Sequence, residues 1–76
     1  SKRFEERKAF RDKVKLFCRI NFINQSDIAE LLNLTKQEFC DFLSGKKNAS
    51  PSKGVVNYDD FKFRVELILG DEFNLI

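Results

Sequence analysis

The chain has 76 residues, of which 42% are hydrophobic and 34% charged, and its formal net charge is +2; it is therefore globular rather than disordered and forms one domain, residues 1–76, at most. It has no His and two isolated Cys, no apolar run near the ~20 residues that span a bilayer, and no signal-peptide pattern at its start. These features exclude a disulfide framework and a Cys/His metal site, and they predict an intracellular protein without a membrane partner, in the nucleus of a eukaryote or the cytoplasm and nucleoid of a prokaryote or phage-infected cell.

The first predicted element is a long basic helix over residues 2–20, a range without Gly or Pro. Its apolar side chains follow helical spacing, with Phe10, Val14 and Phe17 at i, i+4 and i+7 and Leu16 and Ile20 widening the stripe. Residues 1–19 contain eight basic and three acidic side chains. We therefore expect the positive field of the protein to lie on this helix.

Residues 24–45 predict two short helices joined by Asn33-Leu34. Asn24 is the expected cap of the first helix, and Asn33 is expected to end it, because Asn tolerates the left-handed conformation. The second helix begins with the capping box Thr35-Lys36-Gln37-Glu38 and ends at Gly45. The side chains expected to face the core are Ile28, Leu31, Leu32, Phe39, Phe42 and Leu43, and the small Ala29 lets the helices approach closely.

Residues 46–57 predict a polar loop, in which Ser50-Pro51 can start a short helical turn. The last helix is expected over residues 58–69, capped by Asn57, with Phe61, Val65 and Ile68 facing inward. The tail, residues 70–76, contains Phe73, Leu75 and Ile76 and is expected to dock on the core. The Phe residues as a class are expected in the core, because their spacing follows the buried stripe. The predicted fold is a compact all-α bundle of four or five helices.

The segment from Gln25 to Thr35, QSDIAELLNLT, followed by Phe39, Phe42, Leu43 and Gly45, resembles the lambda-repressor-like helix-turn-helix superfamily, which includes phage repressor and Cro proteins and the POU-specific and cut domains. The shared features are a Gln at the start of the second helix, an Ala flanked by aliphatic residues, a hydroxyl residue before the third helix and a closing Gly. The resemblance covers residues 10–70 and departs from the family in the long basic first helix and in residues 49–56. It implies sequence-specific binding of double-stranded DNA, with the third helix in the major groove, by a module of a transcriptional regulator or DNA-processing protein.

The resemblance also implies which side chains contact DNA. The outward face of the third helix would contact bases through Lys36, Gln37, Cys40, Asp41 and Ser44. Gln37 is the best candidate, because its amide can bond N6 and N7 of adenine together. Phosphate contacts would come from Gln25, Lys46, Lys47, Asn48 and Lys53. Each of these residues also has a plainer interpretation as a solvated surface or loop residue, and Thr35 and Glu38 are expected to serve only as the helix cap.

Two acidic side chains leave an alternative open. Glu38 and Asp41 place carboxylates on or near the face of the third helix, where phosphates repel them. The same fold could instead serve protein–protein interaction or homodimerisation through the first helix or the aromatic tail. Enzyme chemistry is not expected, because the chain has no His, no Gly-rich phosphate loop and no nucleophile–base pair. We accordingly expect no cofactor, no metal and no small-molecule substrate.

Overall fold

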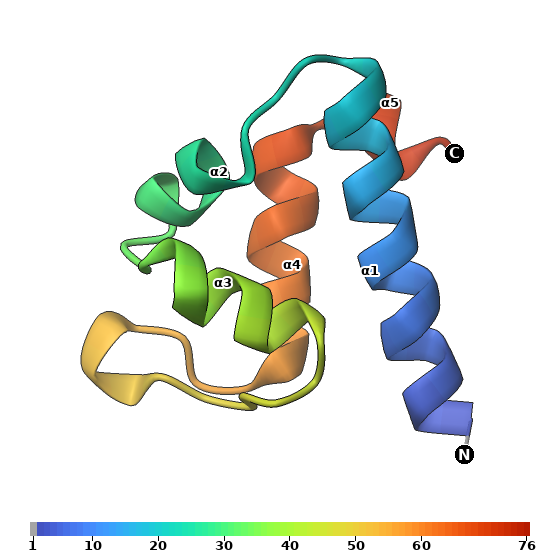
Figure 1. The fold of residues 1–76 in the computed structure, drawn as a ribbon. Coiled ribbons are helices and arrows are strands. Elements are labelled where there is room, and N and C mark those ends of the chain that lie inside the picture. Colours follow the sequence, from blue (N-terminus) through green and yellow to red (C-terminus); the bar gives the residue numbers. More distant parts are fainter. Residues whose placement is uncertain (1) are drawn as a thin grey trace.

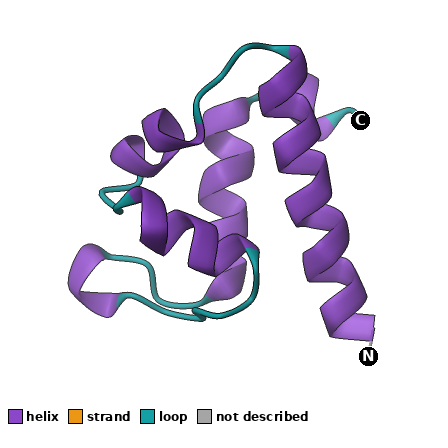
Figure 2. Ribbon diagram, in the orientation of Figure 1, coloured by secondary structure: helices purple, strands orange, loops and turns teal. Residues whose placement is uncertain are grey.

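The computed structural model describes residues 2–76, and this part of the chain is all-helical (Figures 1 and 2). The helices are α1 (Lys2–Ile20), α2 (Gln25–Leu31), α3 (Lys36–Leu43), α4 (Tyr58–Leu69) and α5 (Asp71–Asn74), with a short 3-10 turn, η1 (Pro51–Lys53), between α3 and α4. Figure 1 shows α4 between α1 on one side and α2 and α3 on the other. The Cα radius of gyration is 11.6 Å, close to the ~11 Å of a compact chain of this length. The expectation of a compact all-α protein is confirmed.

Helices α1, α2 and α3 are each followed, two residues after their last helical residue, by a residue with positive φ. After α2 and α3 these residues are Asn33 (φ 61°) and Gly45 (φ 81°), as the sequence predicts, and after α1 the residue is Phe22 (φ 56°). In each case the next backbone N–H donates back into the last turn of the helix, as from Leu34 to the Ala29 carbonyl at 2.8 Å. This arrangement satisfies carbonyls that a helix end otherwise leaves unpaired, and it fixes the direction in which the chain leaves each helix.

The helix starts depend on local side chains. The Thr35 hydroxyl accepts from the backbone N–H of Glu38 at 3.1 Å, and the Glu38 carboxylate accepts from the backbone N–H of Thr35 at 3.1 Å. The capping box of α3 is therefore confirmed. Asn57 caps α4 by accepting from the Asp60 N–H at 2.8 Å. Asn24 occupies the cap position of α2, but its side chain makes no capping hydrogen bond.

The core is dominated by aromatic rings in two connected groups. On the α3 side, Phe61 of α4 stacks on Phe42 with ring centroids 4.6 Å apart. On the α1 side, Phe73 of α5 makes edge-to-face contacts with Phe10 at 6.0 Å and Phe17 at 5.4 Å. Because Phe73 is fully buried, the short α5 closes the core along α1. Edge-to-face and offset-stacked rings are the favoured aromatic arrangements.

The loop between α3 and α4 contributes to this core, which the sequence did not predict. Ser50 and Val55 exchange two backbone hydrogen bonds, of 2.7 and 3.1 Å, around the turn η1. The bridge turns the Val55 side chain inward, where it is fully buried. The helical turn expected at Ser50-Pro51 forms.

Several inward assignments from the sequence are wrong. In α2 the buried side chains are Ile28 and Ala29, and Leu32 directly after the helix is also buried, whereas Leu31 is 72% exposed, because a helix of two turns presents only one narrow edge to α3 and α4. Leu16 and Ile20 are exposed, because only the arc of α1 that carries Phe10, Val14, Phe17 and Cys18 is covered. The other departures are that Ile68 is only partly buried and that Phe4, Phe22, Phe63, Leu75 and Ile76 are exposed.

Candidate nucleic-acid interface

The outward face of α3 carries the side chains expected to contact bases. Lys36, Gln37 and Ser44 are exposed, and Cys40 and Asp41 are half-buried. The Gln37 amide Nε2 donates to the Asp41 carboxylate at 2.9 Å, one helical turn along. The Ser44 hydroxyl donates to the backbone carbonyl of Asp41 at 3.2 Å. The polar groups of this face are therefore ordered by bonds within α3 itself.

A groove of about 360 Å³ joins the outward face of α3 to α1. Arg11 and Lys15 line it from the α1 side. The remaining lining residues are Gln25, Gln37, Cys40, Asp41, Leu43, Ser44 and Lys46. The groove thus brings together, in one place, most of the residues expected to contact bases and two of those expected to contact phosphates. The two cations from α1 were not among the predicted contacts.

Gln25 is the first residue of α2, and it reaches the middle of α3. Its amide oxygen accepts from the Cys40 thiol at 3.9 Å, a weak contact in keeping with the poor donor strength of S–H. The two thiols of the chain, Cys18 and Cys40, are free. Burial raises the pKa of the Cys18 thiol, which makes that residue an inert part of the core.

Glu38 forms an ion-paired cluster with two lysines of the following loop. Lys53 donates to one carboxylate oxygen of Glu38, and Lys47 Nζ lies 3.6 Å from the other. The hydrogen bond from Lys53, together with the backbone N–H of Thr35, lowers the pKa of Glu38 from its ordinary 4.5 to about 2. The cluster offsets the negative charge at the start of α3, and it holds two of the predicted phosphate-binding lysines against that carboxylate.

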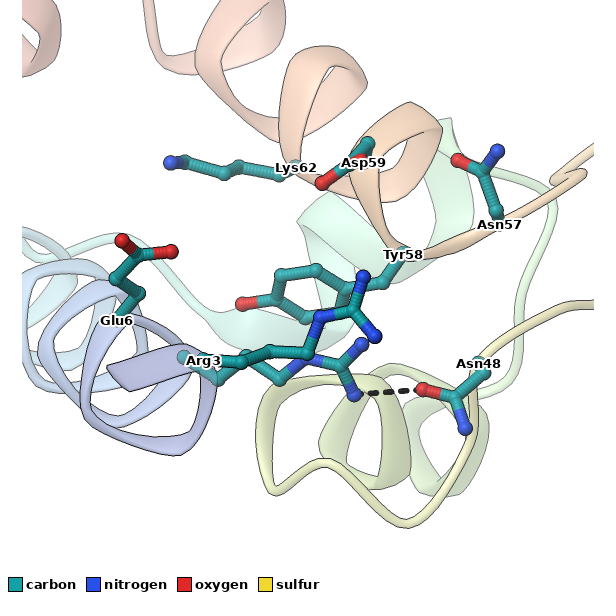
Figure 3. A pocket seen from close by; sticks show the side chains of 8 residues that line it. Arg3, Glu6, Asn48, Asn57, Tyr58, Asp59 and Lys62 are labelled. Atoms are coloured by element: carbon teal, nitrogen blue, oxygen red, sulfur yellow. Dashed lines mark hydrogen bonds between the residues drawn. The ribbon is translucent and has the colours of Figure 1, made fainter. Parts of the chain in front are cut away.

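Asn48 lies apart from the groove, in a separate cavity of about 500 Å³ (Figure 3). Its amide oxygen accepts from Arg7 at 2.6 Å, and the Arg7 guanidinium lies 4.3 Å from the centroid of the Tyr58 ring. Figure 3 shows Glu6 at one end of this cavity, Asn48 and Asn57 at the other, and Tyr58 between them. The Tyr58 hydroxyl is buried without a hydrogen-bond partner among the described residues, and burial raises its pKa.

Within residues 2–76, no three His, Cys, Asp or Glu side chains lie together in a group that could hold a metal ion. None of the helices formed by this part of the chain is long and apolar enough to cross a bilayer. No protein-family model matches the chain, and neither a curated protein nor a solved structure matches it. A function for this surface must therefore be argued from its geometry and charge.

Proposed function

We propose that this protein is a duplex-DNA-binding module in which α2 and α3 act as a lambda-repressor-like helix-turn-helix and α3 enters the major groove. Helix α3 has eight residues, and an α-helix with its side chains is about 10–12 Å across, which fits a major groove about 12 Å wide and 8.5 Å deep. The α3 side that faces away from the core is polar along its whole length. Such a module belongs to a transcriptional regulator or another DNA-processing protein, in the nucleus or nucleoid.

The observation that carries the proposal is the groove in which cations border a hydrogen-bonding face. Arg11, Lys15 and Lys46 line this groove together with Gln37. Cations position a protein on the phosphates, and an amide side chain between them is placed to distinguish bases. Glu38, one of the two acidic residues whose carboxylates would repel phosphates, is offset by Lys47 and Lys53.

Asp41 has a constructive role in this proposal. The Gln37 Nε2 carries two hydrogens, and the bond to Asp41 uses one of them. The second hydrogen remains to donate to N7 of adenine, while the amide oxygen accepts from the N6 amine. Asp41 thereby fixes the orientation of the amide, and it acts as a positioning residue rather than a direct contact.

Fluorescence anisotropy with labelled random duplex DNA at low and moderate salt tests the proposal. We expect binding that weakens as salt rises, because phosphate contacts release counterions. Sequence enrichment from a randomised duplex pool should then give a preferred site with an adenine under Gln37. The variant Gln37→Ala should lose about 1–3 kcal/mol of discrimination at that base pair and keep the salt dependence of the parent. An absence of duplex binding even at low salt overturns the proposal.

A second candidate function is protein–protein interaction or dimerisation. It is favoured by the exposed apolar side chains Leu16 and Ile20 on α1 and Leu75 and Ile76 in the tail, because exposed apolar side chains that form one patch mark an interaction surface. Sedimentation equilibrium tests dimerisation directly, because it measures the molecular mass of the protein in solution. Three results together would establish this function in place of DNA binding. The wild-type protein forms a dimer, the substitution Ile20→Ser or Leu75→Ser dissociates that dimer, and the wild-type protein binds no duplex.

A further inference from the structure

Four cations of α1 lie along one flank of that helix: Lys8, Arg11, Lys15 and Arg19. Their spacing of i, i+3, i+7 and i+11 places them within an arc of about 80° at about 100° per residue. We call this set the basic flank. It spans about 16 Å of helix at about 1.5 Å per residue. In Figure 1, α1 runs past the end of α3.

The basic flank shares three surface grooves with residues of α3 or of its C-terminal end. Lys8 and Arg11 line a groove of about 260 Å³ with Ser44 and Gly45 at the end of α3. Arg11 and Lys15 line the central groove with Gln37.

At the other end, Lys15 and Arg19 line a groove of about 470 Å³ with Gln25 and Lys36. Positive charge therefore follows the polar face of α3 from one end to the other. The acidic residue nearest this row is Asp12, whose carboxylate lies 3.3 Å from Arg11. Lys8, Lys15 and Arg19 are exposed and make no ion pair within residues 2–76.

The loop lysines are in a different situation. Lys47 and Lys53 are paired with Glu38, so a phosphate would have to compete with that carboxylate for them. A charge that already has an acidic partner gains less from a phosphate than an exposed one, because the first interaction must be given up. The exposed cations closest to α3 are therefore on α1, together with Lys36 and Lys46.

We propose that the basic flank of α1 binds the phosphates of one DNA strand while α3 occupies the adjacent major groove. This inference rests on the proposed function and names the surface that supplies its electrostatic part. Each strand of duplex DNA carries a continuous series of phosphate charges, so a row of cations about 16 Å long faces more than one phosphate of the strand. The long basic first helix departs from the pattern of the lambda-repressor-like family. In this proposal it is the phosphate-binding element of the protein.

The test compares two double variants on the same helix with the same chemistry. Lys8→Gln/Lys15→Gln removes two charges from the basic flank, and Lys2→Gln/Lys13→Gln removes two charges from outside it. The affinity for duplex DNA is measured by fluorescence anisotropy at several salt concentrations. Thermal melts of all proteins establish that they are folded, which matters because Lys13 Nζ lies 4.2 Å from the Phe73 ring centroid.

We expect the flank variant to reduce the slope of log affinity against log salt by about 2, since each phosphate contact contributes about 0.9. Between about 50 and 200 mM salt the wild type should then lose roughly tenfold more affinity than the flank variant. The control variant should keep the wild-type slope. If both variants change the slope equally, or neither does, the inference is wrong while DNA binding stands. If the wild type binds no duplex at low salt, the proposed function fails and the inference fails with it.

Discussion

Replacing Phe61 with Ala tests how α3 packs on α4. The Phe61 side chain is fully buried, stacks on Phe42 at 4.6 Å and contacts the rings of Phe39 at 5.6 Å and Tyr58 at 6.0 Å. Removing a buried Phe ring lowers the free energy of unfolding by about 3–5 kcal/mol through lost transfer energy and the cavity that remains. Each aromatic pair accounts for about 0.5–1.5 kcal/mol beyond its buried area. A domain of this size has a total stability of roughly 4–11 kcal/mol, so the substitution should remove at least about a quarter of that stability.

The assay is urea denaturation followed by the helical circular dichroism signal. Phe63→Ala is the matched control, because Phe63 lies on the same helix two residues along and is 62% exposed. Its loss should change the free energy of unfolding by no more than about 0.5 kcal/mol. Equal destabilisation by the two substitutions, or a loss below about 1 kcal/mol for Phe61→Ala, would mean that α4 presents a different face to the core.

Three further substitutions probe individual features. Thr35→Ala removes the capping acceptor of α3 and should lower the free energy of unfolding by about 0.5–2 kcal/mol in urea denaturation, whereas Thr35→Ser should nearly preserve it. Because the pKa of Glu38 is lowered to about 2 in the folded protein, its contribution is complete above its ordinary pKa of 4.5 and is lost as pH falls through about 2. Melts across this acid range should therefore show a shallower decline for Glu38→Gln, and parallel profiles would contradict the Lys53 pairing. Phe22→Asn should raise the free energy of unfolding by up to about 1 kcal/mol, because Asn tolerates positive φ better and the 94% exposed ring has no packing to lose; destabilisation would show that the ring contributes contacts.

The helix boundaries were predictable because their signals are local. The capping box at Thr35 and Glu38 and the left-handed positions at Asn33 and Gly45 involve residues at most four or five positions apart. The rotation of the helices about their own axes was not predictable to the same degree. In α2, both Leu31 and Leu32 fit an apolar stripe, and only packing against α3 and α4 selects Leu32.

In the candidate site, too, the features set by local sequence were predictable and those set by tertiary packing were not. The outward face of α3 follows from the helical period alone, so Gln37 and its neighbours could be assigned from the sequence. The pairing of Glu38 with Lys53 spans fifteen residues and depends on the turn η1. The approach of Arg11 and Lys15 to α3 depends on the packing of α1, and a charge count shows that α1 is basic without showing which neighbour its cations meet.

The buried phenol described above also makes the protein its own optical reporter. Tyr58 is the single tyrosine, and the chain has no tryptophan, so tyrosine fluorescence comes from one ring. That ring lies under the Arg7 guanidinium at the start of α4. Because burial raises the pKa of its hydroxyl, the absorbance of the phenolate should appear at higher pH in the folded protein than in urea. An alkaline spectrophotometric titration therefore reports, without any label, whether the first turns of α1 still cover α4.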